Sequence, residues 1–253
     1  MSQDLTGKIV LVTGASSGIG EACARKFAAR HARLVLAARR VDRLRQLVSR
    51  LGTDVHVLEL DVRDRTAVNA AIAGLPHPWS EIDILVNNAG LSRGLDKLHE
   101  GDYRDWEEMI DTNVKGLLWV SRAVIPGMVA RRRGHLINIG SIAGREVYPN
   151  GNVYCATKFA VDALTKGLRL DLVDTPIRVS TVDPGAVRTE FSEVRFHGDT
   201  ERAAKVYQGF TPLSGDDVAE AVVWVADRPP HVTVADVLIL PSAQASANLI
   251  HRE

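Results

Sequence analysis

Near the N-terminus the chain reads Val10-Leu11-Val12-Thr13-Gly14-Ala15-Ser16-Ser17-Gly18-Ile19-Gly20. An apolar run typical of a strand leads directly into glycines at a GxxxGxG spacing, and a helical pattern follows. Glycine permits a tight strand-to-helix turn and a close backbone approach to a pyrophosphate, and the helix N-terminus offers that anion free N–H groups and a favourable dipole. The alternative is a glycine-rich turn that binds nothing. The pattern predicts a pyrophosphate site formed by Gly14, Ser16, Ser17, Gly18, Ile19 and Gly20.

Downstream of this turn, short β-branched runs alternate with longer amphipathic segments. Such alternation is typical of repeated βαβ units around a parallel sheet. Strands are expected near Lys8–Thr13, Arg33–Ala38, Asp54–Glu59, Ile84–Asn87, His135–Ile139, Ile177–Asp183 and Val234–Leu240. Helices are expected near Gly18–Ala29, Val41–Leu51, Arg63–Ala73, Tyr103–Arg132, Val153–Val173 and Gly215–Ala226. The sequence therefore predicts a single-domain α/β Rossmann fold, a doubly wound parallel sheet of about seven strands with helices on both faces.

The composition is that of a globular enzyme without a charged macromolecular partner. Hydrophobic residues make up 45% of the chain, and 31 Lys and Arg balance 31 Asp and Glu. This balance gives no reason to expect nucleic acid as a partner, and no apolar run approaches the roughly 18 residues of a membrane span. Cys23 and Cys155 lack a CxxC partner and are expected to be reduced thiols, which indicates a cytoplasmic protein. No metal site is predicted.

The end of the predicted second strand carries information about the cofactor. An NAD site is expected to have a carboxylate near this point to bond the ribose 2′-hydroxyl. This chain instead has Ala38 followed by Arg39 and Arg40. A guanidinium pairs well with a 2′-phosphate, and no carboxylate is present to repel one. NADP(H) is therefore the expected cofactor, with Arg39 favoured over Arg40 as the phosphate ligand. The alternative is that both arginines only cap the next helix.

A Tyr-Lys pair in the predicted helix Val153–Val173 indicates acid–base chemistry. Tyr154 and Lys158 are four residues apart, so a helix places them on one face. A free tyrosine has a pKa near 10, and an ammonium one turn away is expected to lower that pKa. Taken alone, such a pair is more often a surface pair. Its context therefore decides the interpretation.

Two polar residues supply that context. Ser141 directly follows an apolar strand, where its hydroxyl is expected to reach a substrate oxygen. Asn113 lies in the middle of a long predicted helix although Asn is a mediocre helix former, so a polar partner is expected. The alternative for Asn113 is an exposed position on the helix.

Together these residues resemble the short-chain dehydrogenase/reductase family over almost the whole chain. The matching pieces are Thr13–Gly20, Asp61-Val62, Asn87-Asn88-Ala89-Gly90, Asn113, Ser141, Tyr154 with Lys158, and Pro184–Thr189. The resemblance implies that Tyr154 is the general acid/base and that Ser141 steadies the reacting oxygen. It also implies that Lys158 binds the nicotinamide ribose and tunes Tyr154, and that Asn113 holds a water linking Lys158 to solvent.

The same resemblance implies further contacts and an assembly. Arg39 corresponds to the NADP-type variant of the family. Adenine would meet Asp61 and Val62. The other cofactor contacts would come from Asn88, Ala89, Gly90, Tyr154, Lys158, Pro184, Gly185, Val187 and Thr189. A homotetramer is expected, packed partly through the helices that hold Asn113 and Tyr154.

The segment 186–213 is long, polar and flanked by Gly and Pro, so it is expected to be a lid over the substrate. Its residues Thr189–Asp199 resemble the lid of NADP-dependent 3-hydroxy acid dehydrogenases, which include serine and allo-threonine dehydrogenases and malonic semialdehyde reductases. Such a substrate needs a cation for its carboxylate, and Arg supplies paired N–H groups. Arg195 is favoured because it lies in this stretch, with Arg145 and Arg188 as alternatives. Each of the three could instead be a solvated surface Arg.

The sequence thus predicts an NADP(H)-dependent oxidoreductase that interconverts a hydroxyl and a carbonyl. Small 3-hydroxy acids such as L-serine, L-allo-threonine or 3-hydroxypropionate/malonic semialdehyde are the expected substrates, bound by Ser141, Arg145, Tyr154 and Arg195. One alternative is a reductase of neutral ketones, diketones or other carbonyls. Another is an NADP(H) sensor without turnover, although the full Asn-Ser-Tyr-Lys set argues against it.

Overall fold

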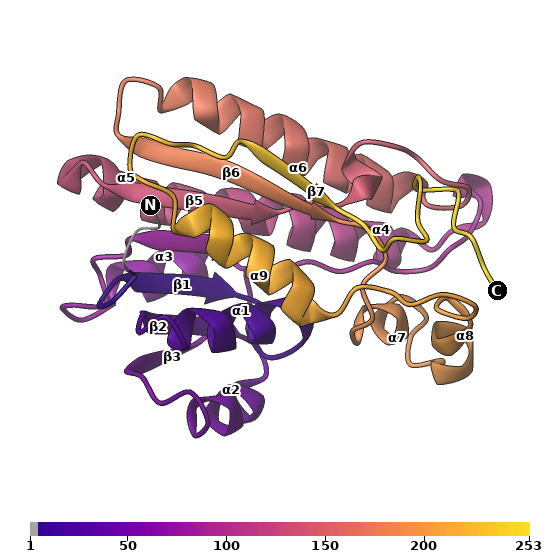
Figure 1. The fold of residues 1–253 in the computed structure, drawn as a ribbon, viewed down its shortest axis with the longest axis horizontal. Coiled ribbons are helices and arrows are strands. Elements are labelled where there is room, and N and C mark those ends of the chain that lie inside the picture. Colours follow the sequence, from indigo (N-terminus) through magenta and orange to yellow (C-terminus); the bar gives the residue numbers. More distant parts are fainter. Residues whose placement is uncertain (1–4) are drawn as a thin grey trace.

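A parallel sheet crosses the molecule in the order β3-β2-β1-β4-β5-β6-β7 (Figure 1). The computed structural model describes residues 5–253. The strands are β1 (Ile9–Thr13), β2 (Arg33–Ala38), β3 (Val55–Glu59), β4 (Ile84–Asn87), β5 (Gly134–Ile139), β6 (Ile177–Pro184) and β7 (Asp236–Ile239). The chain builds outward from β1 to β3 and then returns to the other side of β1. This order confirms the predicted doubly wound Rossmann fold.

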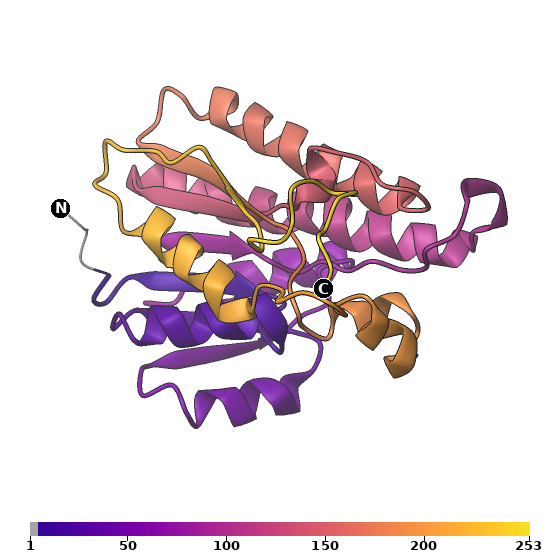
Figure 2. The same ribbon diagram turned by 45° about the vertical axis from the view of Figure 1, so that its right-hand side comes forward.

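Helices cover both faces of the sheet (Figures 1 and 2). One face carries α1 (Gly18–Ala28), α2 (Val41–Val48) and α9 (Gly215–Ala226). The other carries α3 (Arg65–Ala73), α5 (Leu117–Arg131) and α6 (Asn152–Asp171). Phe27 of α1 and Val124 of α5 are among the buried side chains of the two resulting cores. Because each core packs on one side of the same strands, both faces of the sheet are apolar.

Burial along the strands follows from this layering. β1 and β4 are buried over their whole length, whereas the edge strand β7 alternates between exposed and half-buried residues. The inner strands therefore lack the alternation of polar and apolar residues that a one-sided sheet would show.

The region predicted as one helix, Tyr103–Arg132, is divided into three parts. These are α4 (Tyr103–Ile110), a π-helical turn (Asp111–Gly116) and α5. Asn113 lies inside the wide turn, where its side chain is bound to the backbone of Leu91. The prediction of a regular helix was wrong here because it could not take account of this long-range contact.

The segment 186–213 contains two short helices, α7 (Phe191–Arg195) and α8 (Thr200–Lys205). The Asp199 carboxylate caps α8 by accepting a hydrogen bond from the Arg202 N–H at 2.9 Å. Both helices lie beyond the carboxyl ends of the strands, in orange in Figure 1. Short turns occur at Leu98–Glu100 and Ile142–Gly144. Within residues 5–253, no helix is both long and apolar enough to cross a membrane.

Candidate active site

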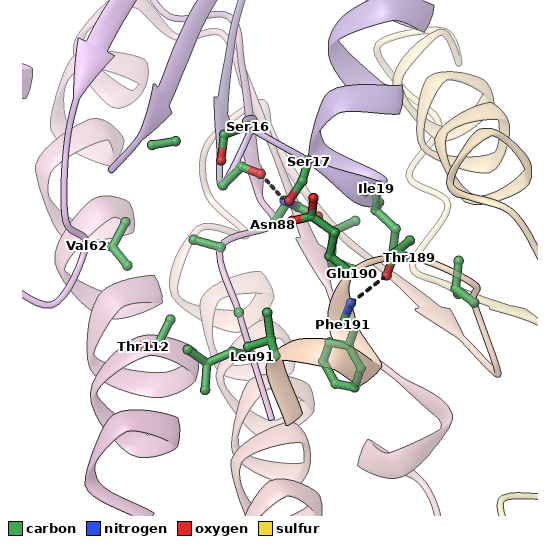
Figure 3. Close-up of a pocket in the computed structure, with 18 of the residues that line it drawn as sticks. Ser16, Ser17, Ile19, Val62, Asn88, Leu91, Thr112, Thr189, Glu190 and Phe191 are labelled. Carbon is green, nitrogen blue, oxygen red and sulfur yellow. Dashed lines mark hydrogen bonds between the residues drawn. The ribbon is translucent and has the colours of Figure 1, made fainter. Parts of the chain in front are cut away.

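A cavity of about 340 Å³ opens at the carboxyl ends of the central strands (Figure 3). This is where doubly wound sheets bind ligands, beside the point at which the strand order reverses. The predicted residues that line it are Gly14, Ser16, Ser17, Gly18, Ile19, Arg39, Arg40, Asp61, Val62, Asn88, Ala89, Gly90, Ser141, Tyr154, Lys158, Pro184, Gly185, Val187 and Thr189. Four predicted residues lie outside this wall, namely Gly20, Asn113, Arg145 and Arg195.

The glycine-rich turn leaves space for an anion at the start of α1. Gly14 and Gly18 have positive φ angles of 65° and 56°, which glycine adopts without steric cost. A Cβ on Gly20 would lie 2.4 Å from the Gly14 carbonyl oxygen. Ser17 precedes α1 without a side-chain capping bond in the described part of the chain, so the first helical N–H groups remain available to a ligand. The turn therefore fits a dinucleotide pyrophosphate.

Asn88 connects this turn to β4. Its Nδ2 donates to the Thr13 carbonyl at 2.9 Å, and its backbone N–H donates to Thr13 Oγ1 at 3.1 Å. The Ala89 N–H donates to the same hydroxyl at 3.0 Å. These bonds fix the ends of β1 and β4 relative to each other beneath the cavity.

Asp61 and Val62 follow β3 and line the cavity. The Asp61 carboxylate accepts hydrogen bonds from Arg63 Nε at 3.0 Å and Nη2 at 2.6 Å. Val62 is buried against Gly116, where an added Cβ would lie 2.7 Å from the valine Cγ2. The two residues present one polar and one apolar surface, a combination suited to a planar base.

Arg40 lies directly against the glycine-rich turn. Its Nε donates to Ser16 Oγ at 3.2 Å, and its Nη2 donates to Ser17 Oγ at 2.6 Å. Arg39 also lines the cavity, but it is exposed and makes no hydrogen bond within residues 5–253. The geometry therefore brings Arg40 closer to the turn than Arg39, the residue that the sequence favoured.

A carboxylate from the segment 186–213 completes this cluster. Nη1 of Arg40 donates to Glu190 Oε2 at 2.8 Å, and Nη1 of Arg43 donates to Glu190 Oε1. Burial acts to raise the pKa of Glu190, but the hydrogen bonds and charges of the two arginines outweigh it and lower the pKa below its usual value. Glu190 is therefore ionised at neutral pH.

Tyr154 and Lys158 project from the first turns of α6, and both are buried. The Lys158 Nζ donates to the Ile139 carbonyl at the end of β5 at 2.9 Å and lies 6.0 Å from the Tyr154 ring centroid. Ser141 follows β5 and is hydrogen-bonded to Tyr154. The structure thus brings the three side chains together around one corner of the cavity.

The electrostatics of this corner differ from the expectation. Burial raises the pKa of Tyr154, and the Arg195 charge and the Ser141 hydrogen bond oppose that rise only in part. Burial also lowers the pKa of Lys158 to about 8, against the opposing charge of Asp183. The pKa of Tyr154 is therefore raised rather than lowered, and the main charge acting to lower it comes from Arg195.

Asn113 is buried in the π-helical turn, where protein atoms use its whole side chain. Its Oδ1 accepts from the Leu91 N–H at 2.8 Å, and its Nδ2 donates to the Leu91 carbonyl at 2.8 Å and to Thr157 Oγ1 at 3.0 Å. Thr157 precedes Lys158 on α6. Asn113 thus connects the π-helical turn to α6, and the predicted water link to Lys158 stays a prediction.

Arg195 extends from α7 over the aromatic side chains beside the cavity. Its guanidinium carbon lies 5.4 Å from the Tyr154 ring centroid and 5.1 Å from that of Phe191. Its Nε donates to Ser92 Oγ at 3.0 Å, and its Nη2 donates to Tyr148 Oη at 2.8 Å. These two bonds hold the guanidinium next to the phenol of Tyr154.

Tyr148 owes its position to a glycine. A Cβ on Gly151 would lie 2.1 Å from Tyr148 Cε2, closer than any side chain could approach. The ring packs there with Tyr154 and Met109 in a small apolar cluster.

The two other arginines considered for a substrate carboxylate have different partners. Arg145 donates from Nε to Asp183 Oδ2 at 2.8 Å, in an ion pair with a buried carboxylate. Arg188 lies with its guanidinium carbon 5.5 Å from the Tyr207 ring centroid. Neither side chain lines the cavity.

The sequence was also compared with known proteins. The model of the family described as short chain dehydrogenase matches residues 8–199. The chain belongs to the short-chain dehydrogenase family. It is therefore a dehydrogenase, an enzyme of the oxidoreductase class, and the resemblance drawn from the motifs is confirmed.

Individual members of the short-chain dehydrogenase family are similar over nearly the full length. An NADP-dependent 3-hydroxy acid dehydrogenase, YdfG, from Salmonella typhi is 50% identical over 96% of this chain and 99% of its own. The closed form of serine dehydrogenase complexed with NADP+ is 48% identical, with a TM-score of 0.93 over 97% of this chain and 100% of that one. Serine dehydrogenase from Escherichia coli is 43% identical, with a TM-score of 0.83 over 94% and 99%.

Sequence reasoning missed several residues of this short-chain dehydrogenase site. Leu91, Phe191 and Val194 form apolar parts of the cavity wall, and Phe191 and Leu91 are seen in Figure 3. Tyr148 lay only six residues before Tyr154, but no pattern connected it to Arg195. Glu190 lay within the predicted lid, but no local pattern connected it to Arg40, which is 150 residues away in the sequence.

Proposed function

We propose that this short-chain dehydrogenase interconverts the hydroxyl and carbonyl groups of small 3-hydroxy acids, such as L-serine, L-allo-threonine or 3-hydroxypropionate/malonic semialdehyde, with NADP(H). One observation carries the proposal: the Arg195 guanidinium lies 5.4 Å from the ring of the buried Tyr154. A cation at this distance from a proton donor suits a substrate whose carboxylate and reacting oxygen are separated by a short carbon chain. The names of the relatives, which include 3-hydroxy acid and serine dehydrogenases, support the same substrate class.

Arg195 is prepared to receive a carboxylate. Ser92 and Tyr148 accept bonds from its Nε and Nη2, while its Nη1 has no hydrogen-bond partner among residues 5–253. The bonded groups fix the orientation, so little side-chain entropy remains to be lost when a substrate binds. The remaining N–H groups then serve the carboxylate with charge-assisted hydrogen bonds.

Tyr154 is the proposed proton donor and acceptor. Burial raises its pKa, so the phenol carries its proton at neutral pH and suits the reduction of a carbonyl. Ser141 shares a hydrogen bond with Tyr154, which lets both hydroxyls meet the same substrate oxygen. Lys158 is bound to the Ile139 carbonyl and holds positive charge near the phenol. When bound, the cofactor accepts or supplies the hydride.

NADP(H) is the proposed cofactor. The turn fits a pyrophosphate, and Arg39 and Arg40 line the adjoining wall where an NAD-specific site would carry an acid. Relatives named as NADP-dependent and a neighbour complexed with NADP+ support this choice. Asp61, Val62, Asn88, Ala89 and Gly90 are proposed to contact the adenosine half, and Pro184, Gly185, Val187 and Thr189 the nicotinamide half.

The segment 186–213 is proposed to act as a lid within this single domain. Phe191, at the start of α7, packs edge-on against the Tyr154 ring at 5.6 Å between centroids. Arg195 lies one turn further along the same helix. Movement of α7 would therefore carry both the Phe191 ring and the Arg195 cation away from Tyr154.

A homotetramer and a cytoplasmic location are also proposed. Leu170 near the end of α6 and Val173 just beyond it are 75% and 81% exposed, which suits an apolar contact with another subunit. Both cysteines are free and buried, as expected for a reducing compartment.

A reductase of neutral ketones or other carbonyls is the second candidate, because Leu91, Phe191 and Val194 make part of the cavity wall apolar. The deciding experiment measures NADP-linked turnover of serine, allo-threonine, 3-hydroxyisobutyrate and 3-hydroxypropionate beside simple ketones. Turnover of the hydroxy acids supports the proposal, and turnover of neutral carbonyls alone overturns it. A Tyr154→Phe variant that binds NADPH but loses nearly all turnover would exclude the role of a sensor.

A further inference from the structure

Glu190 bridges the segment 186–213 and the arginines beside the glycine-rich turn. Its two carboxylate oxygens are occupied by different arginines, Oε2 by Arg40 and Oε1 by Arg43. The same Arg40 donates to the hydroxyls of Ser16 and Ser17 on the glycine-rich turn. Figure 3 shows Glu190 reaching toward this turn from the segment that also carries Phe191.

This arrangement places an anion of the protein where an anion of the ligand is expected. Two guanidinium groups and two serine hydroxyls around one point are the donors that a phosphate monoester requires. The Glu190 carboxylate accepts hydrogen bonds from both guanidinium groups. A 2′-phosphate and this carboxylate have the same sign of charge, so they repel each other when they share the cluster.

We propose that Glu190 competes with the 2′-phosphate of the cofactor for Arg40 and Arg43, and so sets both the strength of NADP(H) binding and its coupling to the lid. The inference rests on the proposed use of NADP(H). Arg43, in the first turn of α2, becomes a second phosphate ligand that the sequence did not suggest. The expected occupant of the cluster is the phosphate of a 2′-phosphorylated adenosine.

The position of Glu190 connects this competition to the corner of the cavity that holds Tyr154. The residue lies between Thr189, which lines the cavity, and Phe191, which packs on Tyr154. When the phosphate displaces the carboxylate, the start of α7 loses its two ion pairs with the α2 region. The phosphate at one end of the cofactor thereby alters the restraint on the lid at the other end.

The test measures dissociation constants by titration calorimetry for NADPH, NADH and 2′,5′-ADP with the wild-type protein and the Glu190→Gln variant. The amide removes the competing charge and keeps the side-chain size. Removing a competing ion pair of this kind is expected to lower the dissociation constants of NADPH and 2′,5′-ADP about three- to tenfold. The affinity for NADH, which has no 2′-phosphate, should stay the same.

Glu193→Gln is the matched control, because Glu193 lies on α7, which begins directly after Glu190, and is exposed, with no ion pair to the described residues. It should leave all three affinities unchanged. Arg43→Gln should weaken the binding of NADPH and 2′,5′-ADP but not the binding of NADH. Unchanged or weaker NADPH binding by Glu190→Gln would overturn the competition, provided that the wild-type protein prefers NADPH to NADH. If the wild-type protein shows no such preference, the proposed cofactor itself is wrong.

Discussion

The Arg195 guanidinium carbon lies 5.4 Å from the centroid of the Tyr154 ring, although the two residues belong to different helices, α7 and α6. The charge of Arg195 also makes the largest contribution that opposes the effect of burial on the Tyr154 pKa. One cation therefore faces both the proposed carboxylate of the substrate and the proposed proton donor. Substrate preference and proton transfer are linked through this side chain.

Arg195→Met should weaken the binding of hydroxy acids. The substitution removes the charge-assisted hydrogen bonds of the carboxylate and keeps much of the side-chain volume. Loss of such bonds corresponds to about 2 kcal/mol, or roughly thirtyfold in KM. Steady-state kinetics should show this rise for a 3-hydroxy acid, while the dissociation constant of NADPH stays within about twofold. An unaltered KM would exclude Arg195 as the carboxylate ligand.

Tyr148→Phe should reproduce part of that effect from a distance. The variant keeps the ring against Gly151 but removes the hydroxyl that accepts from Arg195 Nη2. A freed guanidinium loses orientation, and the expected cost is about 1 kcal/mol, or roughly fivefold in KM for the acid. The kcat/KM for a neutral alcohol or ketone serves as the control and should change little. An equal loss for acidic and neutral substrates would point to a packing defect instead.

Arg40→Asp should reduce NADPH affinity more than Arg39→Asp does. Arg40 is held against the turn by Ser16 and Ser17, whereas Arg39 has no hydrogen bond to any described residue. A carboxylate at position 40 would repel the 2′-phosphate and favour the 2′-hydroxyl of NADH. The expected loss is about 2 kcal/mol in NADPH binding, measured by fluorescence titration. A larger loss of NADPH affinity in Arg39→Asp would identify Arg39 as the main ligand of the 2′-phosphate.

Lys158 should make stability depend on pH above neutrality. Its pKa is about 8 in the folded protein, whereas an unfolded lysine titrates near 10.4. Between these values the unfolded chain binds more protons, so the free energy of unfolding should rise with pH. Relative to Lys158→Met, the wild type should gain on the order of 1–2 kcal/mol between pH 8 and pH 9.5 in urea unfolding. If the free energies of unfolding of the two proteins change with pH in parallel, the lowered pKa of Lys158 is excluded.

The parts of the fold and site that sequence reasoning predicted depend on local patterns. The glycine-rich turn, the Tyr154/Lys158 spacing and the apolar runs of the inner strands each follow from neighbouring residues. The π-helical turn could not be predicted in this way, because it is stabilised by bonds between Asn113 and Leu91, 22 residues apart. The Arg40–Glu190 pair spans 150 residues and is equally invisible to any local pattern.

The wrong prediction of a lowered Tyr154 pKa has the same origin. Helical spacing placed Lys158 on the same face as Tyr154, and this was correct. Spacing could not reveal how deeply both groups are buried, and burial dominates the pKa values of both side chains. Nor could it reveal that α7 brings a second cation over the phenol.

Gly151 shows that the substrate preference of this enzyme depends on a residue outside the cavity. The residue has no place in the cavity wall, yet even a methyl group there would collide with the ring of Tyr148. Displacing that ring would release Arg195. Gly151→Ala, a substitution outside the cavity wall, is therefore a route by which a lineage would lose its preference for acidic substrates.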